Sequence, residues 1–220
     1  MPIFSLDQIY FAYDADGGGK RDIFQNLCFS LSAGDKVGLY GPNGCGKTTL
    51  FRLVTGLEKP RSGRIFFYDQ PMRTEKDFCV LRRKVGLVLQ QSEDQLFCPT
   101  VLDDVAFGPL NLGLGRQDAV HAAVRVLSDL GLQGFENRLV HKLSGGEKKL
   151  TALASVLAMQ PEALLLDEPT GGLDEQSTAC IIRILKTLPA ARIIVSHDKD
   201  FLAETSSKIM TIRQGRLRED

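Results

Sequence analysis

A glycine-rich segment close to the N-terminus constrains the possible folds of this chain more than any other feature. Residues 41–48 read GPNGCGKT, and they follow the apolar run VGLY and precede the helical pattern TLFRLVTGL. This order of strand, loop and helix is the setting that a phosphate-binding P-loop requires. Glycine lets the backbone approach an anion closely, and a helix N-terminus presents free amide N–H groups. The segment therefore predicts a polyphosphate site, with a glycine-rich surface turn as the alternative.

The polar residues of this loop match a nucleoside triphosphate. Lys47 is expected to neutralise the β and γ phosphates, and the Thr48 hydroxyl is expected to complete a Mg²⁺ shell that also takes phosphate oxygens. A nucleoside triphosphate with Mg²⁺ is therefore the predicted ligand. The residues predicted to bind it here are Gly41, Pro42, Asn43, Gly44, Cys45, Gly46, Lys47, Thr48 and Thr49.

A second candidate half of the site lies at the end of an apolar strand. Residues 163–169 read ALLLDEP, so two adjacent carboxylates lie at the carboxyl edge of the expected sheet, where ligands of α/β folds bind. Asp167 is predicted to hold Mg²⁺ through water, and Glu168 to orient or deprotonate the attacking water. His197 follows another apolar strand, RIIVSH, and is predicted to donate a hydrogen bond to the γ phosphate. The alternatives are solvated turn carboxylates and a structural histidine.

Apolar runs that alternate with helical patterns predict an α/β fold with a mainly parallel sheet. The 220 residues suit one domain, 1–220, with an inserted lobe. An N-terminal antiparallel β subdomain (residues 1–35) and a P-loop core together span about 1–90 and 160–220, and a helical lobe spans about 91–159. Five strands are expected after the β subdomain, at residues 36–40, 64–68, 85–89, 163–167 and 192–196, and a last strand at 208–217. Helices are expected after the first and the last two of these five.

Composition narrows the range of functions. Lys plus Arg and Asp plus Glu both number 27, so the chain has no excess positive charge of the kind that favours nucleic acid. The most apolar stretch, residues 150–159, is far shorter than a membrane span, which needs roughly 20 residues. No basic region followed by an apolar run opens the chain, so a cytosolic location is expected. The five cysteines are widely spaced and are expected to be free thiols.

A second expected helix begins with another anion-binding pattern. Residues 143–147 read LSGGE and open the helical run KKLTALASVLAM. Ser144 is a favourable N-cap, and Gly145 and Gly146 leave the amides of the first turn uncovered. One phosphate cradle would suffice to bind a nucleotide. The pattern alone therefore indicates either an ordinary capped helix or a second anion site.

Together these motifs resemble the ATP-binding cassette (ABC) ATPase family. GPNGCGKT, Gln90, LSGGE, LLLDEP, GGLD (residues 171–174) and SHD (residues 196–198) occur in the family's order over nearly the whole chain. The resemblance implies ATP as the nucleotide and a second ATPase subunit, so that the LSGGE of one subunit closes on the γ phosphate held by the other. It also implies that Gln90 reaches Mg²⁺ and that Asp174 connects the two sites. The residues of LSGGE that it implies in nucleotide binding are Ser144, Gly145, Gly146 and Glu147.

The same resemblance implies an aromatic residue stacked on adenine. Tyr13 is the candidate, with Tyr10 and Phe11 as close competitors. Aromatic residues in a strand are more often part of a core, which is the alternative for all three. Stacking of a base on an aromatic ring is favourable by roughly 1 to 3 kcal/mol.

Residues 90–114 resemble a narrower group, the energy-coupling factor transporters and especially their cobalt and nickel importers. The dipeptide QS after Gln90 replaces the usual Asn-Pro of that group. Leu96, Phe97 and Phe107 put large apolar side chains in or beside a surface loop, which indicates either a contact site for an integral-membrane coupling subunit or a pin for the helical lobe. The resemblance implies a peripheral protein at the cytoplasmic face of the cell membrane. Co²⁺, Ni²⁺, biotin and other vitamins are all compatible as the transported substance.

Two other functions compete with that of an importer subunit. A non-transport ABC ATPase acts on DNA or the ribosome, but the long coiled coils or fused second cassette of such proteins are not seen in the sequence, and the balanced charge argues against nucleic acid. A small-molecule kinase built on a P-loop would lack LSGGE and would place phosphate on an organic product. Homodimer and heterodimer are both compatible with the sequence.

Overall fold

The N-terminal segment forms an antiparallel sheet, as the sequence predicts. The computed structural model describes residues 1–14 and 18–219. Strands β1 and β2 pair antiparallel, and the turn predicted between them, at residues 14–20, lies partly outside the described residues. The strand order of this sheet is β2-β1-β4-β5. Its strands are β1 (Pro2–Asp14), β2 (Lys20–Ser32), β4 (Ser62–Phe67) and β5 (Gln70–Pro71).

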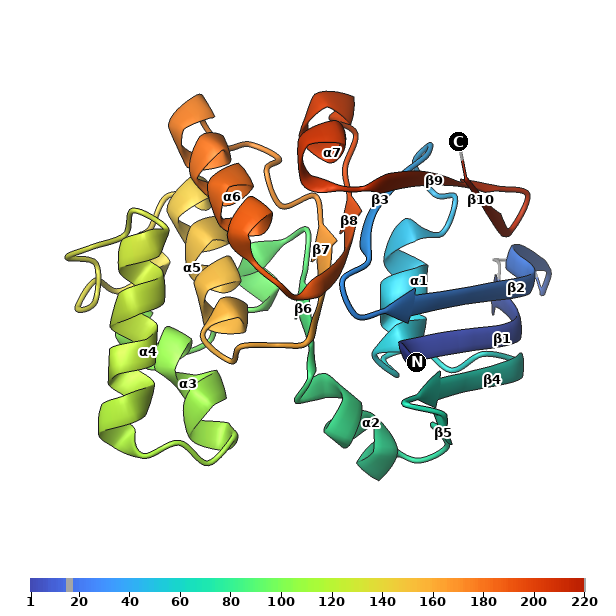
Figure 1. The fold of residues 1–220 in the computed structure, drawn as a ribbon, viewed down its shortest axis with the longest axis horizontal. Helices are drawn as coiled ribbons and strands as arrows, with labels where there is room; N and C mark the ends of the chain where they lie inside the picture. Colours follow the sequence, from blue (N-terminus) through green and yellow to red (C-terminus); the bar gives the residue numbers. More distant parts are fainter. Residues whose placement is uncertain (15–17, 220) are drawn as a thin grey trace.

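A second, mainly parallel sheet crosses the middle of the molecule (Figure 1). Its strand order is β10-β9-β3-β8-β7-β6; β9 and β10 pair antiparallel and the other neighbours pair parallel. The single strand predicted over 208–217 is wrong, because Gln214 and Gly215 both adopt positive φ, 50° and 70°, and turn the chain back as a hairpin. The strands are β3 (Lys36–Tyr40), β6 (Val85–Val88), β7 (Ala163–Asp167), β8 (Ala191–Val195), β9 (Lys208–Arg213) and β10 (Arg216–Glu219).

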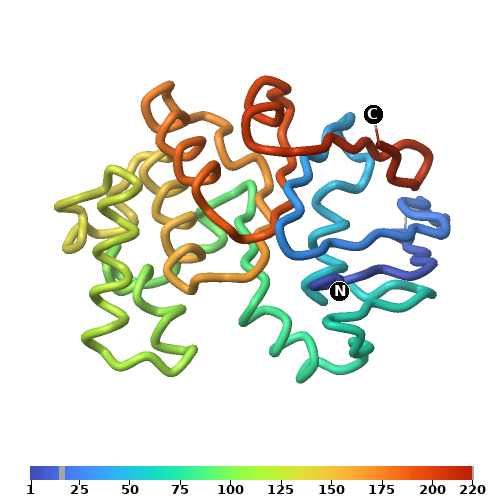
Figure 2. Tube along the Cα trace, viewed as in Figure 1, coloured from blue at the N-terminus to red at the C-terminus, as the bar shows by residue number. Residues whose placement is uncertain are grey.

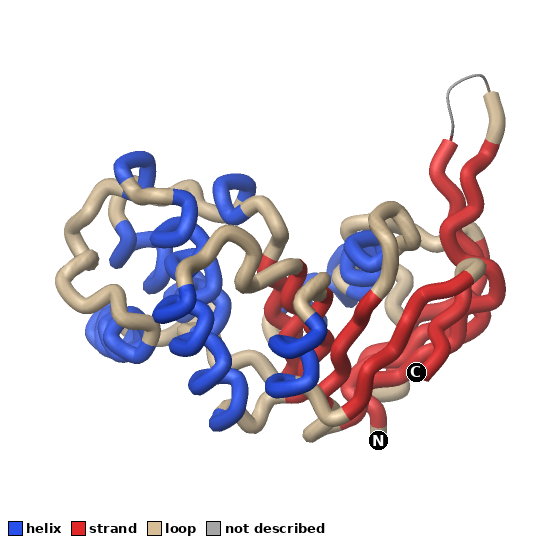
Figure 3. The backbone as a smooth tube through the Cα atoms, turned by 90° about the horizontal axis from the view of Figure 1, so that it is seen from above, coloured by secondary structure: helices blue, strands red, loops and turns tan. Residues whose placement is uncertain are grey.

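Most helices gather on the side of the molecule away from the antiparallel sheet (Figure 3). Helices α1, α6 and α7 follow β3, β7 and β8 as predicted, whereas α2, which begins with a capping box at Thr74 and Asp77, was not predicted. None of the helices in the described part of the chain is long and apolar enough to span a membrane. The helices are α1 (Lys47–Val54), α2 (Glu75–Arg82), α3 (Val101–Asn111), α4 (Arg116–Asp129), α5 (Gly145–Leu157), α6 (Glu175–Thr187) and α7 (Lys199–Thr205), with short 3₁₀ turns at Ser92–Asp94 and Val140–Lys142.

The central strands β7 and β8 of the parallel sheet are buried on both faces. In β7, Leu164 and Leu166 pack in the core that α3 to α6 share, whereas Leu165 packs in the core of the antiparallel sheet and α1. Successive side chains of a strand point to opposite faces, so an unbroken apolar run suits a strand covered on both sides. Helices α3, α4 and α5 form a helical segment, residues 101–157, and Figure 2 shows both chain ends on the side opposite it. The predicted α/β fold is present, and the carboxyl ends of β3, β7 and β8 meet at one edge.

Candidate functional site

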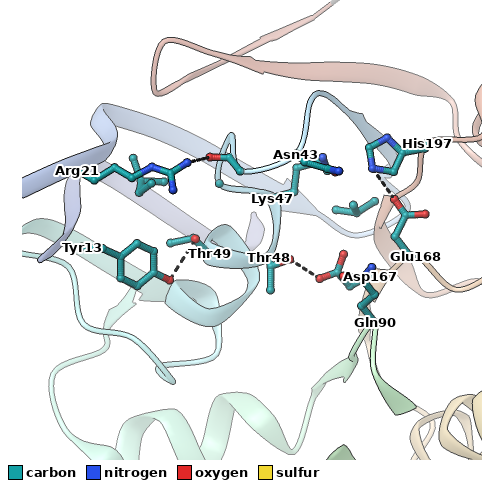
Figure 4. A pocket seen from close by; sticks show the side chains of 14 residues that line it. Tyr13, Arg21, Asn43, Lys47, Thr48, Thr49, Gln90, Asp167, Glu168 and His197 are labelled. Carbon is teal, nitrogen blue, oxygen red and sulfur yellow. Dashed lines mark hydrogen bonds and ion pairs between the residues drawn. The ribbon is translucent and has the colours of Figure 1, made fainter. Parts of the chain in front are cut away.

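The P-loop lies between β3 and α1, and the side chain of Lys47, near its end, folds back over the loop (Figure 4). Lys47 Nζ donates to Gly41 O at 2.6 Å and to Pro42 O at 2.9 Å, and the residue is only 8% exposed. Gly46 adopts φ 110°, and a Cβ at this position would lie 2.6 Å from Ile23 Cγ2, so a larger residue would have to displace the Ile23 side chain. Both acceptors of Lys47 are neutral carbonyls, and the ammonium group therefore keeps its charge available for an anion such as phosphate.

Thr48 joins the P-loop to the end of β7. Its Oγ1 donates to Asp167 Oδ2 at 2.6 Å, and Asp167 is 2% exposed. Burial raises the pKa of Asp167, while the hydrogen bond from Thr48 and the charge of Lys47 oppose that rise. A divalent cation would offset the cost of burying this carboxylate, and a hydroxyl beside a carboxylate supplies the oxygen ligands that Mg²⁺ prefers. Gln90 reaches the same place from the end of β6, so the donors fit Mg²⁺ held together with phosphate oxygens (Figure 4).

Glu168 and His197 face each other at the far end of the cleft (Figure 4). Glu168 Oε1 lies 3.4 Å from His197 Nε2, yet this oxygen is buried and accepts no hydrogen bond from a described residue. A buried carboxylate oxygen without a hydrogen bond is rare in native proteins and marks a place where water or a ligand belongs. The backbone of Glu168 adopts a left-handed conformation, with φ 49°, and its N–H donates to Val195 O at 2.9 Å. The β8 strand therefore fixes the backbone from which this carboxylate projects.

The β1–β2 hairpin supplies the opposite wall of the cleft. Tyr13 OH lies 3.3 Å from Thr49 Oγ1, and the two hydroxyls share one hydrogen bond. Phe11 is buried, and Tyr10 OH donates to Asp22 Oδ1 at 2.8 Å. Of the three aromatic candidates, Tyr13 is the one that lines the cleft.

Arg21 also lines this wall, although it belongs to none of the sequence motifs. It pairs with Tyr13 in the β1–β2 register, so both side chains lie on one face of the sheet. Its Nη2 donates to Gly44 O at 3.1 Å and steadies the tip of the P-loop. Arg21 could have been predicted only from the pairing register of β1 and β2, which no local sequence motif specifies.

These side chains enclose a cleft of about 380 Å³, within the usual size range of small-molecule sites. Gly41, Pro42 and Cys45 belong to the P-loop but do not line the cleft, and Cys45 packs instead against the core of the antiparallel sheet. The predicted residues that do line it are Tyr13, Asn43, Gly44, Gly46, Lys47, Thr48, Thr49, Gln90, Asp167, Glu168 and His197.

Residues 143–147, the signature segment, and Asp174 lie apart from this cleft. Ser144 Oγ accepts from Glu147 N at 3.3 Å and Glu147 Oε2 accepts from Ser144 N at 2.7 Å, which is a capping box at the start of α5. A Cβ at Gly145 would meet nothing within 4 Å, so the amide end of this helix is open. Asp174 caps α6 by accepting from Ser177 N at 2.7 Å, and this bond lowers its pKa. Glu147 and Asp174 border one further cavity, of about 550 Å³.

An apolar groove of about 240 Å³ lies between β6, α3 and α5. Phe97 and Phe107 line it while remaining 66% and 42% exposed, and their ring centroids lie 4.7 Å apart at nearly a right angle. Asp104 is buried and accepts from Phe97 N at 3.1 Å and Cys98 N at 2.8 Å, which fixes the loop that carries Phe97. Leu96 is partly buried against the helical core, as the alternative of a pin for the lobe requires.

The sequence matches known proteins over most of its length. The family model described as ABC transporter matches residues 24–171. The energy-coupling factor transporter ATP-binding protein EcfA of Methanocaldococcus jannaschii is 40% identical and aligns with 99% of this chain and 78% of its own length. Other curated relatives, 48% identical over 97% and 98% of this chain, carry no more specific name than ABC transporter ATP-binding protein.

Two solved structures share the fold. CbiO1 of Clostridium perfringens, part of the ABC transporter complex CbiONQ, superposes with a TM-score of 0.82 at 32% identity and covers 99% of this chain and 87% of its own. A dimeric bacterial ABC transporter cassette superposes with a TM-score of 0.91 at 25% identity and covers 99% of this chain and 97% of its own. The likeness to both proteins extends over the antiparallel sheet, the parallel sheet and the helical segment.

Proposed function

The chain belongs to the ABC transporter family as an ATP-binding ATPase, and from that premise we propose that it powers an importer of the energy-coupling factor type. The observation that carries the proposal is the exposed pair Phe97 and Phe107 at the edge of an apolar groove. Phe97 lies on the loop that begins at Gln90, and Phe107 lies on α3. The similarity to EcfA and to CbiO1 supports it. On this proposal the protein is peripheral, at the cytoplasmic face of the membrane.

In the proposed reaction the cleft holds ATP together with Mg²⁺. Lys47 and the amides at the start of α1 bind the phosphates, because both present positive charge to the cleft. Thr48, Asp167 and Gln90 would hold Mg²⁺, which would supply positive charge to offset the charge that develops on the phosphates. Tyr13 stacks on the adenine ring at the opposite wall.

Glu168 is the proposed general base for the attacking water. Its buried Oε1 has no hydrogen bond from a described residue, so it is ready to accept one from water. His197 approaches this carboxylate from the end of β8 and donates to the γ phosphate. The two side chains come from neighbouring parallel strands, which keeps their separation independent of any flexible loop.

A second ATPase subunit completes the proposed site. The signature segment does not line the cleft of its own chain, and the open amide end of α5 suits the γ phosphate of ATP held by another subunit. Asp174 borders the same cavity as Glu147, which supports its proposed role in connecting the two sites. The likeness to a dimeric cassette supports this arrangement, with the partner either identical or homologous.

The groove is the proposed seat of a coupling helix from an integral-membrane subunit. Exposed aromatic side chains beside an apolar groove are typical anchors for an amphipathic helix. Gln95 ties the loop to the sheet, since its Nε2 donates to Leu87 O at 2.8 Å and its Oε1 accepts from Leu89 N at 3.0 Å. The loop therefore connects Gln90 at the nucleotide to Phe97 at the membrane subunit. The membrane subunits select the transported substance, proposed to be Co²⁺, Ni²⁺ or a vitamin.

The proposal predicts that Phe97→Asp detaches the protein from membranes without unfolding it. A carboxylate at this position would have to be buried without a partner when the helix docks. The measurement is the fraction of protein that sediments with membranes from its host, with ATP binding as the test of folding. Val124→Asp is the matched control, because Val124 is also an exposed apolar residue of the helical segment, 39% exposed on α4.

Membrane binding by Phe97→Asp equal to that of the unaltered protein would contradict the proposed docking groove. Sedimentation of the unaltered protein with ribosomes instead of membranes, or tight salt-dependent binding of DNA, would favour a non-transport ABC ATPase. Retention of an integral-membrane protein by the unaltered chain and by Val124→Asp, but not by Phe97→Asp, would identify the coupling subunit.

A further inference from the structure

Lys149 joins the first turns of α5 to the segment that follows β7. Its Nζ donates to Gly171 O at 2.6 Å and to Glu168 O at 3.1 Å. The side chain is partly buried, and its charge interacts with those of Asp167 and Glu168. One ammonium group of the helical segment therefore binds both ends of the turn 168–171.

The backbone that Lys149 binds has a conformation that needs support. Glu168 has φ 49°, which residues other than glycine rarely adopt, and Gly171 N donates to Glu168 O at 3.2 Å to close the turn. Such a conformation persists only where the surrounding contacts fix it. The direction of the Glu168 side chain follows from this backbone, and it places Oε1 3.4 Å from His197 Nε2.

We propose that Lys149 is a positioning residue for ATP hydrolysis, which aims the Glu168 carboxylate by holding the carbonyls of Glu168 and Gly171. This inference rests on the proposed role of Glu168 as the general base. Because Lys149 belongs to α5, the helix that begins at the signature segment also reaches the base of its own chain. A shift of α5 relative to β7 therefore changes the orientation of Glu168, and the base is aligned only when the helix is in place.

The test compares Lys149→Met with Lys186→Met in protein purified from the membranes of its host. Lys186 is a matched control because it is a helical lysine in an exposed ion pair with Glu204, remote from the cleft residues. Lys149→Met is expected to lower kcat by about tenfold to a hundredfold, the cost of a misplaced catalytic group, while KM for ATP changes less than about twofold. Lys149→Leu, which also removes the donor, replaces Lys149→Met with the same expectation should the methionine variant melt below the assay temperature.

A double variant separates positioning from a merely structural role. In the Glu168→Gln background the group that Lys149 aims is gone, so adding Lys149→Met should leave the residual single-turnover rate unchanged. An unaltered kcat in Lys149→Met, a rise in KM equal to the loss in kcat, or a further loss in the double variant overturns the inference. Full activity of Glu168→Gln alone would instead overturn the proposed base, whereas a slow Glu168→Gln beside a fast Lys149→Met removes only the role of Lys149.

Discussion

The two ends of the proposed ATP site are built in different ways. At the P-loop end, residues far apart in the sequence contact each other: Thr48 donates to Asp167, which is 119 positions away. At the signature segment, the capping bonds run between Ser144 and Glu147, within one turn of the same helix. Burial differs in the same sense, because Lys47 and Asp167 are buried, whereas Ser144 and Gly145 are exposed.

The two ends differ in whether folding of one chain is needed to assemble them. The P-loop end brings buried charged and polar groups together, and each of these groups would be costly to bury without the others. The signature segment needs no such assembly, since the capping box satisfies its polar groups locally. One proposed half-site is therefore assembled within the folded chain, while the other is a capped helix start whose proposed ligand is held by a second subunit.

The largest effect is expected at the assembled end, from Glu168→Gln. If the base is built entirely by the fold of one chain, its loss should lower kcat by about 10² to 10⁴, the usual contribution of general-base assistance. The amide keeps the size of the side chain and leaves Lys47, Thr48 and Asp167 in place, so ATP affinity should persist. The measurement is kcat against KM, together with equilibrium binding of ATP.

Near-normal turnover in Glu168→Gln would remove this residue from the role of base. It would also weaken the comparison, because the assembled end would then lack the group that does the chemistry. Loss of ATP binding in the same variant would mean that Glu168 serves binding, contrary to its position at the far end of the cleft.

The assembled end could be predicted from the sequence because its parts are local motifs on parallel strands. GPNGCGKT and LLLDEP each fix a loop at a strand end, and the parallel sheet brings such ends to one edge, so the pairing of Thr48 with Asp167 follows. Arg21 could not be predicted in this way, because its place beside Gly44 depends on the register of two strands. The contacts of Lys149 could not be predicted either, since its acceptors are backbone carbonyls of a turn whose conformation no residue type indicates.

The next largest effect tests whether the two half-sites belong to separate copies of the chain. Lys47→Ala removes the charge that binds phosphate, and Ser144→Arg blocks the amide end of α5, so each variant alone should hydrolyse ATP very slowly. In an equal mixture of the two variants, half of the dimers contain one copy of each. In such a dimer, one of the two sites combines the intact P-loop of Ser144→Arg with the intact signature segment of Lys47→Ala. Turnover in the mixture should therefore return to about a quarter of the unaltered rate, for a symmetric homodimer.

The mixture can also contradict the proposed arrangement. If ATP turnover does not recover although the two variants bind each other, either both half-sites belong to one chain or the partner subunit is a different protein. Recovery without any binding between the variants would show that one of them was never inactive. The mixture of Lys47→Ala with Glu168→Gln is the control, since both changes affect the assembled end and the intact halves cannot combine in one site.

The smallest effect is expected at the outer wall of the assembled end, where Tyr13 and Arg21 come from the β1–β2 hairpin and not from the parallel sheet. Tyr13→Ala removes a stacking surface worth roughly 1 to 3 kcal/mol, so KM for ATP should rise by about fivefold or more while kcat stays the same. Tyr13→Phe keeps the ring and loses only the hydroxyl contact with Thr49, so it should bind ATP like the unaltered protein. An unchanged KM in Tyr13→Ala would reject the stacking role, and equal losses in both variants would assign the effect to the hydroxyl. Stacking at this wall would mean that the assembled end also depends on a strand outside the parallel sheet. The two ends would then differ only in how many contacts each makes with residues distant in the sequence.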